Sequence, residues 1–407
     1  MMTNNRHIPK RRFKEFASDN DWEEQTLTDF IKLYNGLTYS PNDVRKNGTL
    51  VLRSSNIQSG EIINTDNVYV ASDKATSENV RSGDIIVVVR NGSRSLIGKH
   101  AMVKEEMPNT VIGAFMSGMH SEHSTFVNAL LDTPKFGKEI EKNMGATINQ
   151  ITGAMFSKMN FKIPSGIEQD YIGRFFYSID SLITLHQHKL EKLKNLKKSY
   201  LVELFPAEGQ RVPKRRFPGF EGEWEEKKLG ELGKVITGNT PSTSNASYWS
   251  TSSKGHTWVT PTDINDVLIC YSERYLSDLG WLTARTVPEN SVLVTSIASI
   301  GKNTINTIPV AFNQQINAIV PQNHNSYFIL SAMSRYEKQF KNLAGQTATP
   351  IINKLTFEKF EIQVPLIIEQ QIIGEFFQKL DKSISLQQEK LDKLKDLKKA
   401  YLNELFV

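Results

Sequence analysis

A segment of 39 residues occurs twice in this chain, and this repeat constrains the fold more than any other feature of the sequence. Residues 167–205 align with residues 368–406 at a constant offset of 201, without a gap, and 24 of the 39 positions are identical. The repeat also reaches the start of each half, because Pro9-Lys10-Arg11-Arg12-Phe13 returns as Pro213-Lys214-Arg215-Arg216-Phe217. The sequence therefore predicts two related halves.

Both copies of the repeated segment favour long α-helices. They are rich in Leu, Lys, Glu and Gln and have no proline, and these residue types stabilise helices. Their apolar residues follow a 4-3-4-3 spacing, which is the heptad pattern of a coiled coil. The predicted seam is Ile179, Ile183, His186, Leu190, Leu193, Lys197, Tyr200 and Leu204 in the first copy, and Leu380, Ile384, Gln387, Leu391, Leu394, Lys398, Tyr401 and Leu405 in the second.

A helix of this length needs a partner for its apolar seam. At about 1.5 Å per residue, each helix is on the order of 55–60 Å long, too long to be buried within one small domain. The other copy of the repeat is the nearest candidate, in an antiparallel pair. A coiled coil between two copies of the chain suits the near-identical seams as well and stays open as an alternative. The lysines of the helices, Lys192, Lys194, Lys197, Lys198 and their counterparts, are predicted to form a solvated face, with a role in contacting DNA phosphates or a partner as the alternative.

The segments between the repeats predict globular domains of mixed α/β (α+β) class. The expected organisation is a domain over residues 1–165, a helix over 166–206, a linker over 207–220, a second domain over 221–365 and a second helix over 366–407, with a pseudo-two-fold internal repeat. Faint echoes also relate the two domains: Ser55-Asn56-Ile57 matches Thr262-Asp263-Ile264, Ile97-Gly98-Lys99 matches Ile300-Gly301-Lys302, and Ala114-Phe115 matches Ala311-Phe312.

Composition adds weaker constraints. The single cysteine, Cys270, can build neither a disulfide framework nor a thiolate metal site, so a reducing cytoplasm is expected. The polar, basic start of the chain lacks the apolar core of a secretory signal, and no apolar run is long enough to span a membrane. The net charge of +5 permits nucleic-acid binding without demonstrating it.

One unit recurs in both domains and carries the candidate binding chemistry. A β-branched run, Asp84–Val89 in one domain and Ser291–Thr295 in the other, leads into a small polar loop that ends in Ile-Gly-Lys. Arg and Asn or Gln read guanine and adenine respectively, while Ser, Thr and Lys contact phosphates. A plain polar turn is the alternative reading of either loop alone. The predicted DNA-binding residues are Arg53, Ser54, Asn56, Arg90, Asn91, Ser93, Arg94 and Lys99 in the first half, and Thr262, Ser296, Ser299, Lys302, Asn303, Gln314 and Gln315 in the second.

The sequence contains no complete motif of a known catalytic site. Gly92 to Lys99 resembles a phosphate-binding loop, but it has one intervening residue too many and His100 where Ser or Thr should ligate magnesium. No dinucleotide-binding glycine pattern, zinc-protease motif, serine-hydrolase elbow or Asn/Asp-Pro-Pro-Tyr/Phe segment of amino-methyltransferases is present. The chain is therefore expected to bind neither metal nor cofactor and to have no catalytic residue.

The duplicated chain resembles the specificity subunits of type I restriction-modification enzymes. Ile-Glu-Gln followed by Ile-Gly-x-Phe-Phe, and the ending Leu-Lys-Lys-x-Tyr-Leu-x-Glu-Leu-Phe, are both present twice, and Arg53–Ile57, Asn91-Gly92-Ser93 and Ala311–Gln315 fit as well. The resemblance covers essentially the whole chain.

The resemblance implies that each domain recognises one half of a bipartite site in double-stranded DNA, while the helices set the gap between the halves. It also implies that two methyltransferase subunits, which supply the S-adenosylmethionine chemistry, dock on the chain and that restriction (motor) subunits join them. Two alternatives are a stand-alone DNA-binding regulator that dimerises through its helices and a coiled-coil scaffold that binds no nucleic acid.

Overall fold

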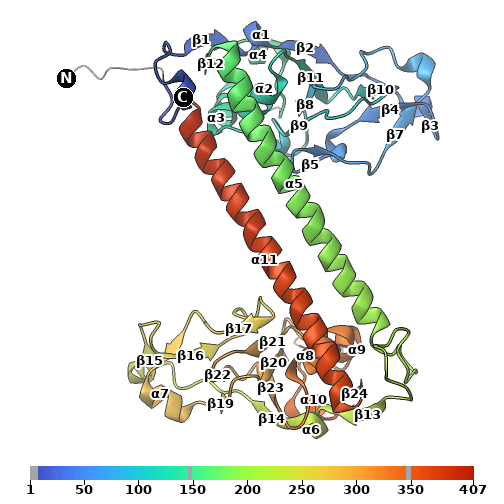
Figure 1. Cartoon of the computed structure of the whole chain (residues 1–407), viewed down its shortest axis with the longest axis vertical. Coiled ribbons are helices and arrows are strands. Elements are labelled where there is room, and N and C mark those ends of the chain that lie inside the picture. Colours follow the sequence, from blue (N-terminus) through green and yellow to red (C-terminus); the bar gives the residue numbers. More distant parts are fainter. Residues whose placement is uncertain (1–7, 145–148, 345–349) are drawn as a thin grey trace. The chain divides into compact units, whose positions relative to one another are not determined.

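The computed structural model describes residues 8–144, 149–344 and 350–407, and it separates into two compact units (Figure 1). Unit 1 comprises residues 1–187 and 390–407, and unit 2 comprises residues 188–389. The two long helices are α5 (Gly166–Glu203) and α11 (Ile367–Leu405), and each contributes residues to both units. The unit boundaries therefore cut through the predicted helices instead of falling at their ends.

Within the described residues, unit 1 contains two four-stranded sheets. The antiparallel sheet has the order β2 (Lys32–Asn35), β11 (Met116–His120), β8 (Ile85–Val88) and β9 (His100–Met102). In the mixed sheet, the order is β10 (Thr110–Ile112), β4 (Thr49–Leu52), β7 (Val68–Val70) and β3 (Val44–Arg45), with β10 and β4 parallel. Two strand pairs accompany them, β1 (Glu23–Thr26) with β12 (Asn160–Ile163) and β5 (Ile57–Gln58) with β6 (Glu61–Ile62). The other helices are α1 (Leu27–Phe30), α2 (Ser124–Leu131), α3 (Pro134–Asn143) and α4 (Gly153–Phe156).

Unit 2 repeats this plan with one more strand in each large sheet of its described part. The first sheet has the order β14 (Gly233–Thr237), β23 (Ile316–Pro321), β20 (Val292–Thr295), β21 (Asn303–Asn306) and β17 (Leu268–Ile269). The second has the order β15 (Trp249–Ser250), β18 (Tyr275–Leu276), β16 (His256–Val259), β22 (Val310–Phe312) and β19 (Thr286–Val287), and β13 (Glu225–Lys228) pairs with β24 (Glu361–Val364). The shorter helices are α6 (Leu229–Leu232), α7 (Asp278–Thr283), α8 (Ser326–Arg335), α9 (Glu337–Asn342) and α10 (Lys354–Glu358).

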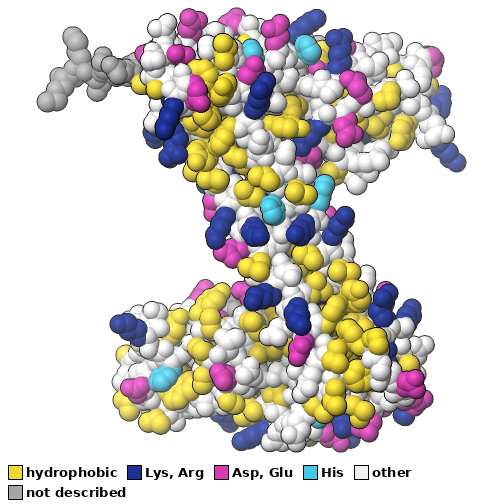
Figure 2. Space-filling view, viewed as in Figure 1, with side chains coloured by type: hydrophobic (Ala, Val, Ile, Leu, Met, Phe, Trp, Pro, Cys, Tyr) yellow, Lys and Arg dark blue, Asp and Glu magenta, His cyan; other side chains and the backbone are white. Residues whose placement is uncertain are grey.

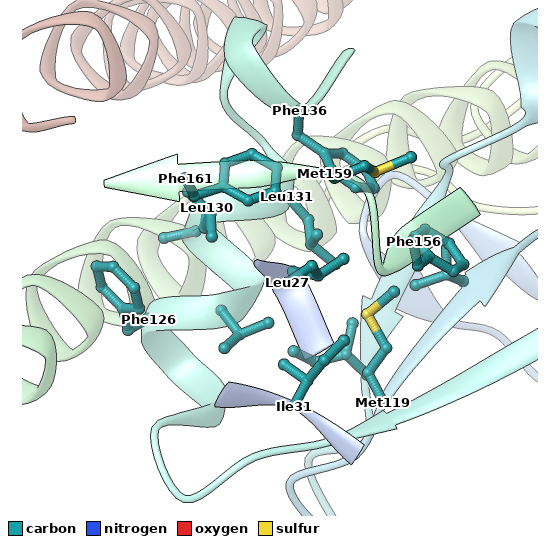
Figure 3. Packing of buried hydrophobic residues seen from close by; sticks show 14 of the residues in the cluster. Leu27, Ile31, Met119, Phe126, Leu130, Leu131, Phe136, Phe156, Met159 and Phe161 are labelled. Atoms are coloured by element: carbon teal, nitrogen blue, oxygen red, sulfur yellow. The ribbon is translucent and has the colours of Figure 1, made fainter. Parts of the chain in front are cut away.

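The predicted central strands are present because both of their faces are buried. Along β8, Ile85 and Val87 pack into the core beneath α2 and α3, while Ile86 and Val88 face the core between the two sheets. Figure 3 shows residues of the first of these cores, including Phe126, Phe136 and Phe161. A strand covered on both faces is apolar at nearly every position, which explains the uninterrupted apolar runs Ile85–Val88 of β8 and Val292–Val294 of β20.

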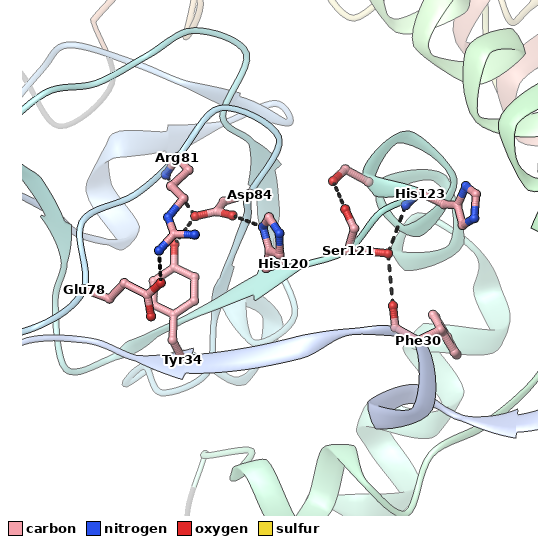
Figure 4. A network of polar contacts seen from close by, with 9 residues as sticks. Phe30, Tyr34, Glu78, Arg81, Asp84, His120, Ser121 and His123 are labelled. Carbon is pink, nitrogen blue, oxygen red and sulfur yellow. Dashed lines mark hydrogen bonds and ion pairs between the residues drawn. The ribbon is translucent and has the colours of Figure 1, made fainter.

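The start of β8 is fixed by a polar network (Figure 4). The buried carboxylate of Asp84 accepts hydrogen bonds from the Tyr34 hydroxyl at 2.7 Å and the backbone N–H of Arg81 at 2.9 Å, and it lies 3.0 Å from Nδ1 of His120. Burial and the neighbouring carboxylate raise the pKa of the Tyr34 phenol, so the phenol stays protonated and donates. The network holds the end of the strand that lies opposite its polar loop.

The repeated sequence motifs meet in each unit as a buried ion pair. In unit 1 the guanidinium of Arg12 forms two hydrogen bonds with the carboxylate of Glu168, at 2.7 and 2.8 Å. In unit 2, Arg216 binds Glu369 in the same way at 2.8 Å. Both glutamates are fully buried. The recurrence of Pro-Lys-Arg-Arg-Phe and of Ile-Glu-Gln is thus explained by one bidentate contact that orders the start of each helix.

The α5 and α11 segments within each unit run in opposite directions, as their contacts show. In unit 1, Phe175 contacts Tyr401 with ring centroids 5.0 Å apart, and Asp180 binds Lys398. In unit 2, Tyr200 contacts Phe376 at 4.8 Å, and Lys197 binds Asp381. None of the predicted seam residues is exposed. The apolar seam prediction is consistent with this burial.

Two lysines depart from the predicted solvated face. Figure 2 shows Lys and Arg side chains on the surface over the long helices, and Lys192, Lys194 and Lys198 are exposed. Lys197 and Lys398 instead form ion pairs inside the units, and Lys398 lies 2.5 Å from Asp132 and 2.6 Å from Asp180. Burial lowers the pKa of Lys398, but the two carboxylates outweigh this effect and raise it overall. No helix in the described ranges is long and apolar enough to cross a membrane.

Candidate nucleic-acid interface

Three segments that are distant in the sequence meet at one edge of unit 1. The first is the loop that follows β8, residues 90–96. The second is the turn Gly113–Phe115, whose Phe115 carbonyl accepts hydrogen bonds from the N–H groups of Val89 and Arg90 at 2.9 and 3.1 Å. The third is the turn after β4, because the Asn91 side-chain amide donates to the Ser54 hydroxyl at 3.2 Å. We call this three-segment surface the loop face of unit 1.

Unit 2 has an equivalent loop face with the same backbone pattern. The Gln315 carbonyl accepts from the N–H of Ser296 at 2.8 Å, as the Phe115 carbonyl does from Val89. The N–H of Asn313 donates to Val259 at 2.9 Å, matching the bond from Gly113 to Leu52. The loop face of unit 2 therefore consists of the turn after β16, the loop after β20 and the turn Asn313–Gln315.

This equivalence corrects one alignment drawn from the sequence. Gly113, Ala114 and Phe115 correspond to Asn313, Gln314 and Gln315, so the match of Ala114-Phe115 with Ala311-Phe312 is wrong. The dipeptide Ala-Phe is a chance identity, since Ala311 and Phe312 are buried strand residues whereas Ala114 and Phe115 are exposed. The match of Asn56 with Asp263 is confirmed, because each side chain accepts from the backbone N–H three residues before it, at 2.9 and 2.7 Å.

The loop after β8 presents most of its predicted residues to solvent. Arg90, Ser93 and Arg94 are exposed, while Asn91 and Lys99 are half-buried. The Asn91 side-chain oxygen accepts from the N–H of Ser93 at 3.0 Å, which holds the loop in a turn. Arginine, amide and hydroxyl groups are thus gathered on one surface whose shape is set by backbone hydrogen bonds.

The turn after β4 departs from the prediction. Arg53 is half-buried and binds both the carbonyl and the carboxylate of Asp66, at 2.7 and 2.6 Å. Asn56 is fully buried, and its amide donates to Thr65 and Asn67 at 2.8 and 3.1 Å. The structure gives Asn56 a structural role in place of the predicted DNA contact. Ser54 is half-buried and lies on the loop face.

In unit 2, four predicted residues are accessible. Thr262, Lys302 and Gln314 are exposed, and Gln315 is half-buried. They are joined by residues that the sequence reading missed: the Thr240 hydroxyl donates to the Gln314 side-chain oxygen, and the Asn313 side-chain oxygen accepts from the N–H of Gln315 at 2.7 Å. The polar run Thr237-Gly238-Asn239-Thr240, which begins at the last residue of β14, could have signalled this segment.

Two further predictions in unit 2, Ser296 and Asn303, are contradicted by internal side-chain hydrogen bonds, whereas Ser299 stays a prediction. Ser296 is buried, and its hydroxyl accepts from the Asn317 amide at 2.7 Å. Asn303 begins β21, and its side-chain oxygen accepts from Ser334 of α8 at 3.4 Å, so it faces the domain interior. Ser299 is half-buried and holds the loop through its carbonyl, which accepts from the Thr295 hydroxyl.

The two loop faces differ in chemistry although they share a backbone frame. The face of unit 1 carries the cations Arg90 and Arg94 together with the exposed ring of Phe115, whereas the turns of unit 2 carry the amides Gln314 and Gln315. Among the described residues, no group of three or more His, Cys, Asp or Glu side chains is placed to hold a metal ion. The arrangement offers hydrogen bonds, positive charge and apolar contact, which are the means of nucleic-acid recognition.

Comparison with known proteins shows that both halves match the same family model. A model described as the type I restriction modification DNA specificity domain matches residues 19–195 and again residues 221–396. The chain is 31% identical over 188 residues to the type I restriction enzyme HindI specificity subunit of Haemophilus influenzae, and 33% identical over 172 residues to the EcoR124I/EcoR124II specificity subunit of Escherichia coli. These two alignments cover 43% and 40% of this chain, and only 39% and 42% of the relatives' own lengths.

Longer matches have lower identity. A putative type I restriction enzyme MjaX specificity subunit of Methanocaldococcus jannaschii is 21% identical over 95% of this chain and 92% of its own length. The crystal structure of a type I restriction-modification system S subunit from M. genitalium superposes with a TM-score of 0.69 at 15% identity, over 98% of this chain and 99% of the other. At that identity the structural match establishes a shared fold.

Proposed function

Because the family model matches both halves, this chain belongs to the family of type I restriction modification DNA specificity domains, and we propose that it is the DNA-specificity subunit of a type I restriction-modification enzyme. Each unit would recognise one half of a bipartite target in double-stranded DNA. The observation that carries the proposal is the loop face: the same three-segment backbone frame occurs in both units, with different side chains on it. Two domains that recognise different half-sites require the same backbone structure with different side chains on it.

The long helices would set the gap between the half-sites as an antiparallel coiled coil. Helix α5 has 38 residues and α11 has 39. Within each unit the two helices are joined by aromatic contacts and a lysine–aspartate ion pair. Buried polar pairs in a helix seam favour one register over others. Such a pair of helices would resist sliding, which a fixed spacing between two binding sites demands.

We propose that the chemistry resides in partner subunits. Two methyltransferase subunits would bind this chain and carry S-adenosylmethionine, and restriction subunits would join them. An enzyme that modifies a base must take it out of the helix, so recognition and base chemistry are suited to separate chains. This chain would contribute the recognition of the DNA sequence and no catalytic residue.

A regulator that dimerises through its helices is the less well supported alternative. Its dimer needs a seam that is free to meet a second chain. The seam residues of α5 and α11 are instead buried or half-buried within the single chain, and Leu190 and Leu391 are only 6% and 3% exposed. These contacts favour a monomer in which α5 and α11 bury each other's apolar seam.

Methylome sequencing of a host that expresses the chain with its methyltransferase tests the proposal. We expect methylated adenines in one bipartite motif with a fixed gap. Arg94→Ala should relax only the half-site of unit 1 and Lys302→Ala should weaken binding through unit 2, with affinity falling steeply as salt rises because phosphate contacts release counterions. A substitution in one unit that changed the preference in both half-sites would contradict two independent readers.

A further inference from the structure

Phe115 is an exposed aromatic side chain on the loop face of unit 1. It is 54% exposed, although its neighbour Met116 is 2% exposed at the start of β11. The ring therefore offers an apolar contact surface among the polar and charged residues of the loop face. The structurally equivalent residue in unit 2 is Gln315, a residue with full hydrogen-bonding capacity.

Phe115 is held through its backbone, and its ring makes one side-chain contact. Its carbonyl is held by the N–H groups of Val89 and Arg90. The guanidinium carbon of Arg90 lies 5.1 Å from the centroid of the ring, within the range of a cation–π contact. Arg90 places positive charge beside the ring, which suits a partner lined with phosphates.

We propose that Phe115 is a specificity residue that contacts the C5-methyl group of a thymine in the half-site of unit 1. The inference rests on the proposed function. A phenyl ring has no donor or acceptor with which to read the polar base edges, and the thymine methyl is the apolar group that base pairs present in the major groove. Gln315 at the same place in unit 2 suits an adenine, whose N6 amino group donates to the side-chain oxygen of Gln while N7 accepts from its side-chain NH2.

Replacing thymine by deoxyuridine tests the proposal, because it removes only the methyl group. The full chain, bound to its methyltransferase, first selects duplexes from a pool randomised at both half-sites. The half-site of unit 1 is the one whose selection changes with Arg94→Ala. The selected duplex is then resynthesised with deoxyuridine at each thymine of that half-site in turn, and its affinity is measured by fluorescence anisotropy at fixed salt.

We expect one deoxyuridine to weaken binding by the unaltered chain about fourfold, the factor for one methyl group removed from an apolar contact. Phe115→Ala should bind the thymine duplex more weakly and show no response to that deoxyuridine. Phe115→Leu, which keeps an apolar side chain, should retain part of the response. Gln315→Ala, the matched change in unit 2, should leave the fourfold effect intact.

The outcomes separate this inference from the proposed function. Sequence-specific binding with no sensitive thymine, or equal sensitivity in Phe115→Ala, would overturn the role of Phe115 and leave the two-reader model standing. A unit 1 half-site without thymine in either strand would overturn it as well. If the complex selects no sequence from the pool, the proposed function itself fails, and the inference fails with it.

Discussion

Replacing Phe406 by alanine should destabilise unit 1, the unit that holds the beginning of the chain. Phe406 follows α11 and is 8% exposed. Its ring centroid lies 5.5 Å from that of Phe126, 5.8 Å from Phe176 and 6.3 Å from Trp22, the last at 90°. Truncating a buried phenylalanine to alanine costs about 3–5 kcal/mol, from lost apolar burial and the remaining cavity. That is a large part of the ~5–15 kcal/mol that keeps a typical domain folded.

Hydrogen exchange followed by mass spectrometry can assign this loss to one unit. Core amides of unit 1 that exchange through unfolding of that unit should exchange faster by about two to four orders of magnitude, since each ~1.4 kcal/mol is a factor of ten. Peptides of unit 2 should keep their protection. The matched control is Phe205→Ala, because Phe205 packs against Phe328 and Phe377 of unit 2 at 5.4 and 6.1 Å, and it should give the opposite pattern.

Phe406→Ala would have the opposite outcome if it left the protection of unit 1 unchanged or lowered protection mainly in unit 2. Either result would mean that the residues following α11 do not complete the core around Trp22.

Three further predictions concern single contacts. Lys398→Met should lower the stability of unit 1 by about 2 kcal/mol, the order of a hydrogen bond to a charged group, because it leaves the half-buried carboxylate of Asp180 without its cation. Denaturant unfolding should show this loss, and Lys398→Met combined with Asp180→Leu should recover part of it. Gly118→Ala should lower the melting temperature, since a Cβ there would lie 2.0 Å from the Tyr34 ring and overpacking costs about 1–3 kcal/mol; an unchanged melting temperature would count against the packing. Burial lowers the pKa of His324 in the folded state, so its contribution to stability is complete above the unfolded value of about 6.5 and decreases as the pH falls toward the lower folded pKa; His324→Gln should flatten that part of the stability–pH curve.

The repeat and the long helices could be predicted because their signals are local. A heptad pattern can be recognised from neighbouring turns of one helix alone. The apolar run around Ile86 can likewise be recognised as a strand without knowing which elements cover it. The predicted run Ser291–Thr295 likewise became β20, from Val292 to Thr295. The division of each helix between two units could not be predicted, because it depends on contacts such as that of Trp22 with Phe406, which are nearly the whole chain apart.

The loop residues show a second limit. Sequence cannot distinguish a polar side chain that faces solvent from one that satisfies buried backbone groups. Asn56 and Ser296 have the residue types of DNA contacts, but both are buried and hydrogen-bonded, as buried polar groups generally are. Conversely, the sequence pairs Ala114-Phe115 with the buried Ala311-Phe312, and only the place of Phe115 in the turn before β11 leaves it exposed.

The division of the chain between the units also fixes an order of events during synthesis. Unit 2 is one continuous stretch, residues 188–389, whereas unit 1 needs residues 390–407 in addition to residues 1–187. A ribosome therefore completes all the parts of the second unit before it supplies the segment that closes the first. Domains made earlier usually fold earlier. Here the unit whose first residues are translated first cannot complete its core until residues 390–407 are made. A ribosome that stops near residue 390 therefore leaves unit 1 with an open apolar core.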